Sequence, residues 1–519
     1  MTRAIATAAP SPAPSLQGRG VAALAVIMVL CAFAGRAVFL SQPVNSDTAM
    51  FVYMGKMVTD GQRIGTDLVD NKLPTVGLLM SVPFRLLGAH WWAYTLLGLG
   101  LTIATCLMLA RTAGRCLGAR AIVPVGVASA IWLNLPPVVY GPLQLETIQV
   151  FFVTQAACAG MELLKRRDWR DAIVLGLCAG IAMWAKPTAA AIIPAITLAV
   201  IVATGWTIAM RLRMLALIAI GVMIPTIICL WLLMLTGMAD ALPDTIAQLR
   251  DYSANSTAEW IDALKPIFVL TILMFPVLVL GYIFRRDRVD RSALFVPQGE
   301  SRAISLFIIA WLIMEMIGVI AQRRMYAYHF LVMGAPAAML LGLFALRIRM
   351  ISLGLALGPA AAISIACSVE VLQRSDGQAR MTEVIGYLKS HAHAGQRVWM
   401  DDYPRLMVES TLRPGSRVPL TFLFANSDEA PQHFGGMILD DLDERRPEWL
   451  VLHRDPERYI HFYRHHMAEV AEIPQRGENF AAAWRRIDGY ARSHYMVVER
   501  VDNIDILRRA NTPVVDARD

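Results

Sequence analysis

The stretch that decides the fold begins with Asn45-Ser46-Asp47-Thr48-Ala49-Met50-Phe51 and ends with Asp67-Leu68-Val69-Asp70-Asn71-Lys72-Leu73-Pro74. It follows the first long apolar run of the chain, residues 20–41. The quoted residues include three aspartates and one lysine. Charged side chains are costly within a bilayer, and membrane proteins usually keep them there for a function. The stretch therefore indicates a polar loop beside a membrane, with chemistry of its own.

The composition predicts a membrane protein. Of 519 residues, 56% are hydrophobic and 17% are charged, whereas soluble domains usually carry about 25% charged residues. An apolar run of about 20 residues is long enough to cross a bilayer as a helix. Such runs occupy residues 20–41, 91–111, 121–139, 147–164, 171–186, 187–204, 214–236, 263–284, 303–321, 329–346 and 350–368. We expect a mainly α-helical, polytopic protein with about eleven transmembrane helices.

Basic residues gather after every even-numbered apolar run. The clusters are Arg111, Arg115 and Arg120; Lys165, Arg166, Arg167 and Arg170; Arg211 and Arg213; Arg285, Arg286, Arg288 and Arg291; and Arg347 and Arg349. Because cytoplasmic loops are enriched in lysine and arginine, these loops and the N-terminus are predicted to be cytoplasmic. The loop at 42–90 and the tail at 369–519 then lie outside, on the periplasmic side of an inner membrane. This topology explains the net charge of +7, and no nucleic-acid partner is expected.

Several shorter features bound the remaining possibilities. Residues 1–19 are predicted to be a disordered cytoplasmic tail, with a cleaved signal peptide as the alternative. The Lys186-Pro187 pair is either a turn between two spans or a kink in one helix. None of the seven cysteines forms a Cys-x-x-Cys pair, so no zinc site or disulfide framework is expected. No Walker-type phosphate loop occurs, so nucleotide binding has no support.

Two short helices are predicted within the loop at 42–90. Apolar residues recur at intervals of three and four over residues 49–60 and 75–88, which is typical of amphipathic helices. Both segments are short for a span, so we expect them to lie on the membrane surface. This arrangement would place Asp47 at the start of the first helix, and Asp70 and Lys72 at the start of the second.

One pattern in this loop carries a resemblance. It consists of Asp47, Tyr53, Gly61, Asp67, Asp70, Lys72 and Pro74. It resembles the first loop of the GT-C glycosyltransferases of the protein-mannosyltransferase type (family 39 and relatives), which include lipid A aminoarabinose transferases and rhizobial lipopolysaccharide galacturonosyltransferases. Lys186-Pro187-Thr188 and the link from Arg323 to Phe330 resemble two further motifs of this family. The chain departs from the pattern at Thr48 and Leu73, where a second acid and a second proline are common.

The resemblance implies a reaction. A sugar would move from a polyprenyl-phosphate donor to an acceptor hydroxyl, with inversion, and one carboxylate suffices as the base. The resemblance assigns that role to Asp47, and the alternative is that Asp47 only caps the following helix. With Thr48 in place of a second acid, single-base chemistry stays intact, and no metal or other cofactor is expected.

The leaving lipid phosphate needs fixed cations near the membrane surface. The candidates are Lys72, Lys186, Arg323 and Arg324. A lysine in an apolar run usually faces a cavity or a partner, which favours Lys186, whereas the arginines could simply extend to the membrane interface. Asp67 and Asp70 would orient Lys72 or bind sugar hydroxyls, with a solvated acidic loop as the alternative.

Further side chains are candidates for the same cavity. Glu146 opens an apolar run on the external side, and Tyr328 and His329 follow the arginine pair. The alternative for His329 is an ordinary interfacial histidine. The polar loop at 237–262, which contains Tyr252, would gate a lipid entrance or form a surface amphipathic helix.

The composition becomes polar and charged after residue 368. Helices are predicted at 376–392 and 436–445, and strands at 396–400 and 447–452, with one or two more strands within 493–508. Alternating helices and strands of this kind predict a small α/β domain. The expected role of this domain is to cap the external cavity or to assist acceptor binding.

Two classes of function compete at this stage. The first is a lipid-linked sugar transferase, whose acceptor is a lipid, a glycan or a protein hydroxyl. The second is a transporter or flippase of lipid-linked glycans. Transporters usually contain internal repeats with broken helices in both halves, and the 45–74 pattern has no evident second copy. The transferase is therefore the leading hypothesis.

Overall fold

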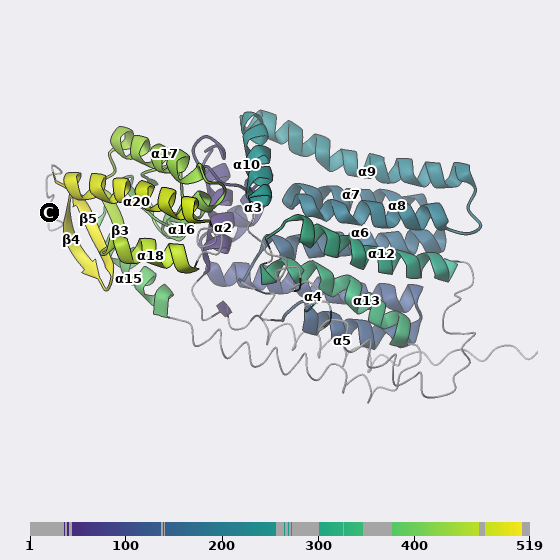
Figure 1. The fold of residues 1–519 in the computed structure, drawn as a ribbon. Coiled ribbons are helices and arrows are strands. Elements are labelled where there is room, and N and C mark those ends of the chain that lie inside the picture. Colours follow the sequence, from purple (N-terminus) through teal and green to yellow (C-terminus); the bar gives the residue numbers. More distant parts are fainter. Residues whose placement is uncertain are drawn as a thin grey trace, which may run out of the picture.

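Long apolar helices form one half of the molecule, and a mixed sheet with its own helices forms the other (Figure 1). This computed structural model describes residues 44–135, 141–255, 300–324, 326–345, 376–466 and 473–510, with a few isolated positions such as Arg36 and Val139. The predicted tail at 1–19 and most of the predicted spans at 20–41, 263–284 and 350–368 lie outside the described residues.

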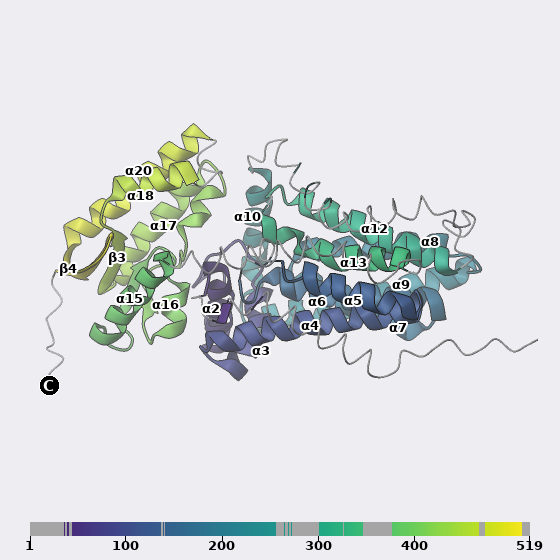
Figure 2. The same ribbon diagram turned by 90° about the horizontal axis from the view of Figure 1, so that it is seen from below.

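The helical half is a bundle whose helices run roughly side by side (Figures 1 and 2). Its described members are α4 (Trp91–Cys116), α5 (Ile122–Trp132), α6 (Leu145–Arg166), α7 (Trp169–Ala185), α8 (Ile192–Val202), α9 (Ile208–Leu235), α12 (Glu300–Ala321) and α13 (Gly334–Ala345). Helices α7 and α9 pack closely because glycines face each other at their crossing. A Cβ on Gly221 would stand 2.7 Å from the Ile173 carbonyl oxygen.

Eight predicted spans coincide with these eight helices. Four of the described helices are long and apolar enough to cross a membrane: α4, α6, α9 and residues Arg302–Ala321 of α12. The other four helices are shorter, and α5 ends at Trp132, well before the predicted end at 139. The mainly helical fold is therefore confirmed, and the total of eleven spans stays a prediction.

The break at Lys186-Pro187 is a turn between two helices. Helix α7 ends at Ala185, a 3-10 turn η2 (Pro187–Ala191) follows, and α8 then begins. Arg167, just before α7, donates a hydrogen bond to the carbonyl of Gly205, just after α8, at 3.4 Å. The far ends of the two helices therefore meet at the same end of the bundle.

Three helices lie between the bundle and the C-terminal half. They are α2 (Ser46–Thr59), α3 (Thr75–Leu87) and α10 (Leu242–Ala254), which follows the 3-10 turn η3 (Ala239–Ala241). Helix α3 keeps exposed apolar side chains, with Val82 60% and Leu86 78% exposed, as a helix at a membrane surface would. Helix α2 differs from the predicted surface helix, because its residues from Thr48 to Met54 are all buried.

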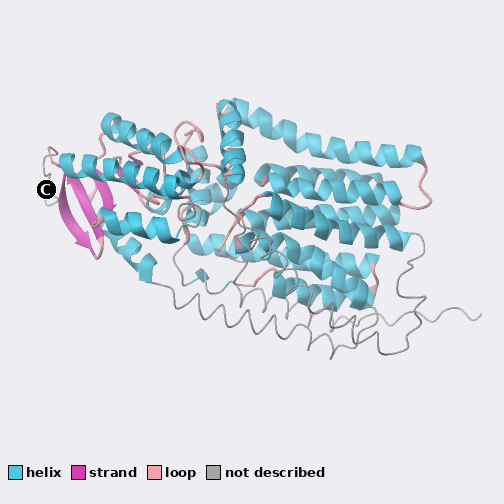
Figure 3. Cartoon of the chain, viewed as in Figure 1, coloured by secondary structure: helices cyan, strands magenta, loops and turns pink. Residues whose placement is uncertain are grey.

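The C-terminal half is an α/β domain built on one five-stranded sheet, drawn in magenta in Figure 3. The strands are β1 (Arg397–Met400), β2 (Arg413–Pro414), β3 (Trp449–His453), β4 (Tyr495–Val501) and β5 (Ile504–Arg509), in the order β2-β1-β3-β5-β4. Strands β2 and β3 are parallel to β1, whereas β5 is antiparallel to β3 and β4 is antiparallel to β5. The helical elements are α15 (Asp376–His391), α16 (Pro404–Glu409), η6 (Thr421–Ala425), α17 (Ala430–Arg445), α18 (Pro456–His466) and α20 (Pro474–His494).

The predicted elements of this domain are present. The helix at 376–392 is α15, the strands at 396–400 and 447–452 are β1 and β3, and the final strands are β4 and β5. The predicted helix at 436–445 is only the last part of α17, and α20 was not predicted. Trp399, Trp449 and Trp484 fill the core, each at most 2% exposed.

The domain packs against the end of the bundle that carries the loop after the first apolar run. The ring of Tyr403, just before α16, meets the ring of Tyr53 in α2 edge-on, with centroids 6.0 Å apart. The Val69 amide donates a hydrogen bond to the Arg417 carbonyl at 2.8 Å. Helix α2 is buried on its outer side because the domain covers it.

Candidate active site

Asp47 lies in the first turn of α2, and another residue caps that helix. The side chain of Asn45 accepts a hydrogen bond from the Thr48 amide at 3.2 Å, and Asn45 is the N-cap. Thr48 donates its hydroxyl to the Leu143 carbonyl at 3.0 Å, which fixes the start of α2 on the segment before α6. The alternative that Asp47 serves only as a cap is therefore wrong. Its half-buried carboxylate stands at the positive end of a helix dipole.

Charged groups of both signs surround Asp47. Burial is the main cause that raises the pKa of Asp47, because desolvation disfavours the charged carboxylate. Lys72 and Lys186 oppose this effect, and Glu146 and Asp70 add to it. These groups come from the loop between α2 and α3, from the start of α6 and from the end of α7, so the fold brings together residues that the sequence separates widely.

Each lysine near Asp47 has an acid of its own. Lys72 Nζ lies 3.2 Å from Asp70 Oδ1 and 5.8 Å from the centre of the Phe51 ring. Burial opposes the charge of Lys72, but Asp70 and Asp47 outweigh it and raise the pKa of Lys72. Lys186 forms an ion pair with Glu146, which is 4% exposed. Each lysine therefore forms its ion pair with an acid other than Asp47.

His329 continues this chain of contacts. Its Nδ1 lies 2.6 Å from the Arg324 carbonyl oxygen, and its Nε2 lies 3.8 Å from Glu146 Oε1. A carbonyl only accepts, so Nδ1 carries a proton in this contact. Tyr328, beside His329, lies within electrostatic reach of Asp47 and Glu146. The predicted pair Tyr328 and His329 therefore belongs to the group around Asp47.

Arg323 and Arg324, the two arginines of the 322–328 link, both contact other parts of the protein. The sequence had left open that they simply extend to the membrane interface. Arg324 is buried, lies 4.1 Å over the ring of Tyr252, and donates hydrogen bonds to the carbonyls of Tyr252 (3.1 Å) and Ala425 (3.5 Å). Arg323 is exposed, has a left-handed φ of 53°, and donates to the Ala254 carbonyl at 3.1 Å. Both side chains contact the C-terminal end of α10, where cations stabilise the helix dipole.

Asp67 stands apart from the group. Its carboxylate accepts a hydrogen bond from the Arg63 amide at 2.8 Å and so closes the turn before α3. It is not among the charges with the largest effect on the pKa of Asp47. Two residues that were not among the predicted site residues also interact with this part of the molecule. Tyr252 of α10 acts electrostatically on Lys72, and Asp402 of the C-terminal domain accepts a hydrogen bond from the hydroxyl of Ser46.

Sequence reasoning had a signal for only one of these two residues. The loop at 237–262, which contains Tyr252, was a candidate gate of a lipid entrance, with a surface amphipathic helix as the alternative. Asp402 lies in an ordinary strand-to-helix connection, and nothing in the sequence links it to Ser46. Within the described ranges, no set of three or more His, Cys, Asp or Glu side chains is arranged to hold a metal ion.

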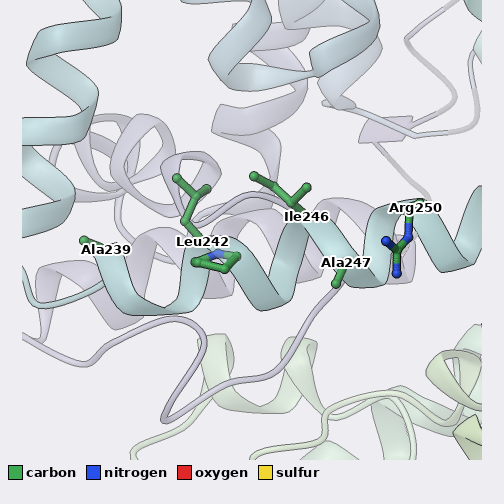
Figure 4. Close-up of a pocket in the computed structure, with 6 residues that line it drawn as sticks. Ala239, Leu242, Ile246, Ala247 and Arg250 are labelled. Atoms are coloured by element: carbon green, nitrogen blue, oxygen red, sulfur yellow. The ribbon is translucent and has the colours of Figure 1, made fainter.

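A separate apolar groove of about 490 Å³ lies on α10 (Figure 4). It is lined by Ala239, Leu242, Pro243, Ile246, Ala247 and Arg250. None of the charged residues around Asp47 lines it, so the groove and the charged site are different surfaces.

Comparison with known proteins agrees with this architecture. Residues 71–231 match the family described as dolichyl-phosphate-mannose-protein mannosyltransferase, a range that includes Lys72, Glu146 and Lys186 and begins after Asp47. No curated protein matches the chain in sequence.

Solved structures match over nearly the whole chain. ArnT from Cupriavidus metallidurans bound to undecaprenyl phosphate is 14% identical, with a TM-score of 0.62 over 95% of this chain and 98% of that one. The oligosaccharyltransferase AglB from Archaeoglobus fulgidus, in complex with an inhibitory peptide and a dolichol-phosphate, is 11% identical, with a TM-score of 0.52 over 96% of this chain and 76% of that one. The resemblance noted in the sequence is therefore confirmed, and this chain has the fold of the GT-C glycosyltransferases of the protein-mannosyltransferase-like type.

Proposed function

We propose that the protein is an inverting membrane glycosyltransferase that moves a sugar from a polyprenyl-phosphate donor to an acceptor hydroxyl, with Asp47 as the general base. The observation that carries this proposal is the Asp47 carboxylate itself. It stands at the start of α2, half-buried, within electrostatic reach of two lysines that each form an ion pair with another acid. Within the described parts of the chain, no hydrogen bond ties it down, so it is available to a substrate.

The proposed step is a single displacement. The acceptor oxygen attacks the anomeric carbon as the bond from that carbon to the lipid phosphate breaks, and the hydroxyl proton passes to Asp47. A base works best when its pKa approaches the working pH, and burial raises the pKa of Asp47 in that direction. One displacement inverts the configuration of the sugar.

Lys72 and Lys186 would stabilise the leaving phosphate. Fixed cations that face the developing negative charge lower the barrier without reorganising at the moment of reaction. Asp70 and Glu146 hold the two ammonium groups in place, and Asp70 helps to keep Lys72 protonated. His329 Nε2 lies 3.8 Å from the same Glu146 oxygen that pairs with Lys186.

We assign the charged site to the external face of the inner membrane, with residues 20–368 as the membrane domain and 369–519 as the external domain. The distribution of basic residues supports this orientation. Lys165 donates a hydrogen bond to the Arg115 carbonyl, and Arg115 pairs with Glu162 at 3.3 Å. These groups lie at the ends of α4 and α6 far from the C-terminal domain, where a cytoplasmic basic cluster is expected.

The donor class is supported by the solved relatives, which contain undecaprenyl phosphate in ArnT and dolichol-phosphate in AglB. The sugar is a hexose or a pentose in this proposal. The acceptor is a lipid, a glycan or a protein, and lipopolysaccharide is the first candidate because the pattern from Asp47 to Pro74 resembles that of the lipid A aminoarabinose and lipopolysaccharide galacturonosyltransferases.

Purified full-length protein in detergent tests the proposal. It would be given a panel of undecaprenyl-phosphate monosaccharides, with lipopolysaccharide and a Ser/Thr-rich peptide as acceptor probes. We expect transfer by the wild type and a loss of about 10²–10⁴ in kcat for Asp47→Asn, which is the usual effect of removing a general base. The matched control is Asp60→Asn, an exposed aspartate at the other end of α2.

Two outcomes contradict the proposal. Transfer at wild-type rates by Asp47→Asn would remove Asp47 as the base. A wild type that moves lipid-linked sugars across vesicle membranes but transfers none of them would favour the flippase.

A further inference from the structure

A pair of aspartates follows the carboxyl end of β1, where parallel strands commonly present ligand-binding groups. The first, Asp401, is used inside its own domain. Its carboxylate accepts hydrogen bonds from the Thr421 amide and hydroxyl, both at 2.8 Å, and from the Tyr459 hydroxyl. The second, Asp402, contacts the other half of the molecule through the hydroxyl of Ser46, the residue before Asp47.

The backbone holds Asp402 in an unfavourable conformation. Its φ of 59° lies in the left-handed region, which non-glycine residues rarely adopt and which is often found at functional sites. Its amide donates to the Pro419 carbonyl at 3.1 Å. The next residue, Tyr403, donates its hydroxyl to the Ser416 carbonyl at 2.7 Å and packs on Tyr53. The contacts on both sides therefore fix Asp402 beside the start of α2.

One oxygen of Asp402 has no donor. Oδ2 accepts the Ser46 hydroxyl, whereas Oδ1 is buried and no protein donor within the described ranges reaches it. Burial raises the pKa of Asp402 to about 7; the hydrogen bond from Ser46 and the charge of Arg405 oppose this, and Asp401 and Asp47 add to it. Thr48 is committed to the Leu143 carbonyl. Asp402 therefore adds a carboxylate from the C-terminal domain to the acids that lie within electrostatic reach of Asp47.

Resting on the proposed function, we infer that Asp402 is an acceptor-binding residue, whose Oδ1 accepts a hydrogen bond from a second hydroxyl of the acceptor, next to the one that Asp47 deprotonates. The acceptor then binds between α2 and the C-terminal domain. A sugar ring carries neighbouring hydroxyls and satisfies both carboxylates at once. An isolated serine or threonine hydroxyl does not. The acceptor class is therefore a sugar-bearing molecule.

Steady-state kinetics with a reactive undecaprenyl-phosphate sugar and lipopolysaccharide test this inference. We expect Asp402→Ala to raise the KM for lipopolysaccharide by about tenfold or more, as the loss of a hydrogen bond to a charged group does. The KM for the donor and kcat should stay near the wild-type values. Asp402→Asn, which keeps an acceptor oxygen but no charge, should give an intermediate KM. The control is Asp443→Asn, an exposed aspartate of α17.

A pH series separates binding from a merely structural role. In the wild type, the KM for lipopolysaccharide should rise as the pH falls through about 7, because a protonated Asp402 is a weaker acceptor. The charged groups that act on Asp402 are Asp47, Asp401 and Arg405, and all three remain in Asp402→Asn. A step that vanishes in Asp402→Asn therefore belongs to Asp402, even if Asp402→Ala does not fold.

The outcomes distinguish the two proposals. If the wild type transfers sugar and Asp402→Ala matches Asp443→Asn in acceptor KM, this inference is overturned and the transferase stands. Transfer only to the Ser/Thr-rich peptide would overturn the sugar-bearing acceptor. Absence of transfer from every donor would instead overturn the proposed function.

Discussion

At the scale of single residues, the ion pairs separate two paired lysines from the Asp47 carboxylate, which belongs to neither pair. Asp70 and Glu146 balance Lys72 and Lys186, so the Asp47 carboxylate is not consumed by a salt bridge. The pair with Asp70 also raises the pKa of Lys72, while burial raises the pKa of Asp47. The proposed base and two lysines can therefore lie within one small site, although opposite charges usually neutralise each other.

This division predicts how activity depends on pH. Because the pKa of Asp47 is raised above its ordinary value of 3.8, kcat should fall on acidification at a pH above that value, as the base becomes protonated. Lys72, whose pKa is raised above 10.5, should stay charged throughout and produce no alkaline limb below that pH. The measurement is kcat at saturating donor and acceptor. It would be repeated in Asp402→Asn to exclude Asp402 as the source, and a flat acid limb would contradict this role of Asp47.

At the scale of elements, hydrogen bonds from three arginines fix the C-terminal end of α10. Arg323, Arg324 and Arg476 donate hydrogen bonds to the carbonyls of Ala254, Tyr252 and Asn255. These carbonyls belong to the last turn, where a helix lacks internal partners. Three cations from two halves of the molecule therefore anchor one helix end.

Removing the buried member of this anchor should destabilise the protein. Arg324→Met loses two hydrogen bonds and the stacking on Tyr252, and we expect a cost of about 2–3 kcal/mol. The measurement is the apparent Tm of the purified protein, with Arg250→Met, at an exposed arginine of α10, as the control. A normal Tm combined with a raised KM for the donor would show instead that Arg324 acts on the lipid phosphate, as the sequence suggested.

At the scale of the whole molecule, the C-terminal domain and the bundle share α2. Its residues are buried on one side by α3 and on the other by α16 and the residues before it. The helix that carries Asp47 is therefore buried between the two halves of the complete protein.

A substitution at this junction should affect both halves. Tyr403 is fully buried against Tyr53, and truncating such an aromatic side chain costs about 3–5 kcal/mol. We expect Tyr403→Ala to lower the apparent Tm and to reduce transfer. Phe462→Ala, which removes a ring that is 52% exposed in the same domain, should change neither. Two separate unfolding transitions in the wild type would contradict the shared helix.

Local patterns predicted most elements of the fold, because apolar runs, basic clusters and strand alternation are properties of neighbouring residues. The loop charges Asp47, Asp70 and Lys72 were identified for the same reason. The burial of Arg324 and the contact of Asp402 with Ser46 were not predictable, because they depend on packing between distant segments. Ser46 and Asp402 are 356 positions apart. The surface position expected for α2 was wrong because its covering domain lies far along the chain.

The shared helix also limits how the protein can be recombined. A chimera that joins this bundle to the C-terminal domain of a relative would replace Tyr403 and Asp402 but keep Tyr53 and Ser46. The exchanged domain would meet α2 without the side chains that fit it. Grafts that carry the segment from 44 to 74 together with the C-terminal domain preserve both contacts. Substitutions that accumulate in one half during evolution must therefore remain compatible with the other half, because both halves pack against the same helix of 14 residues.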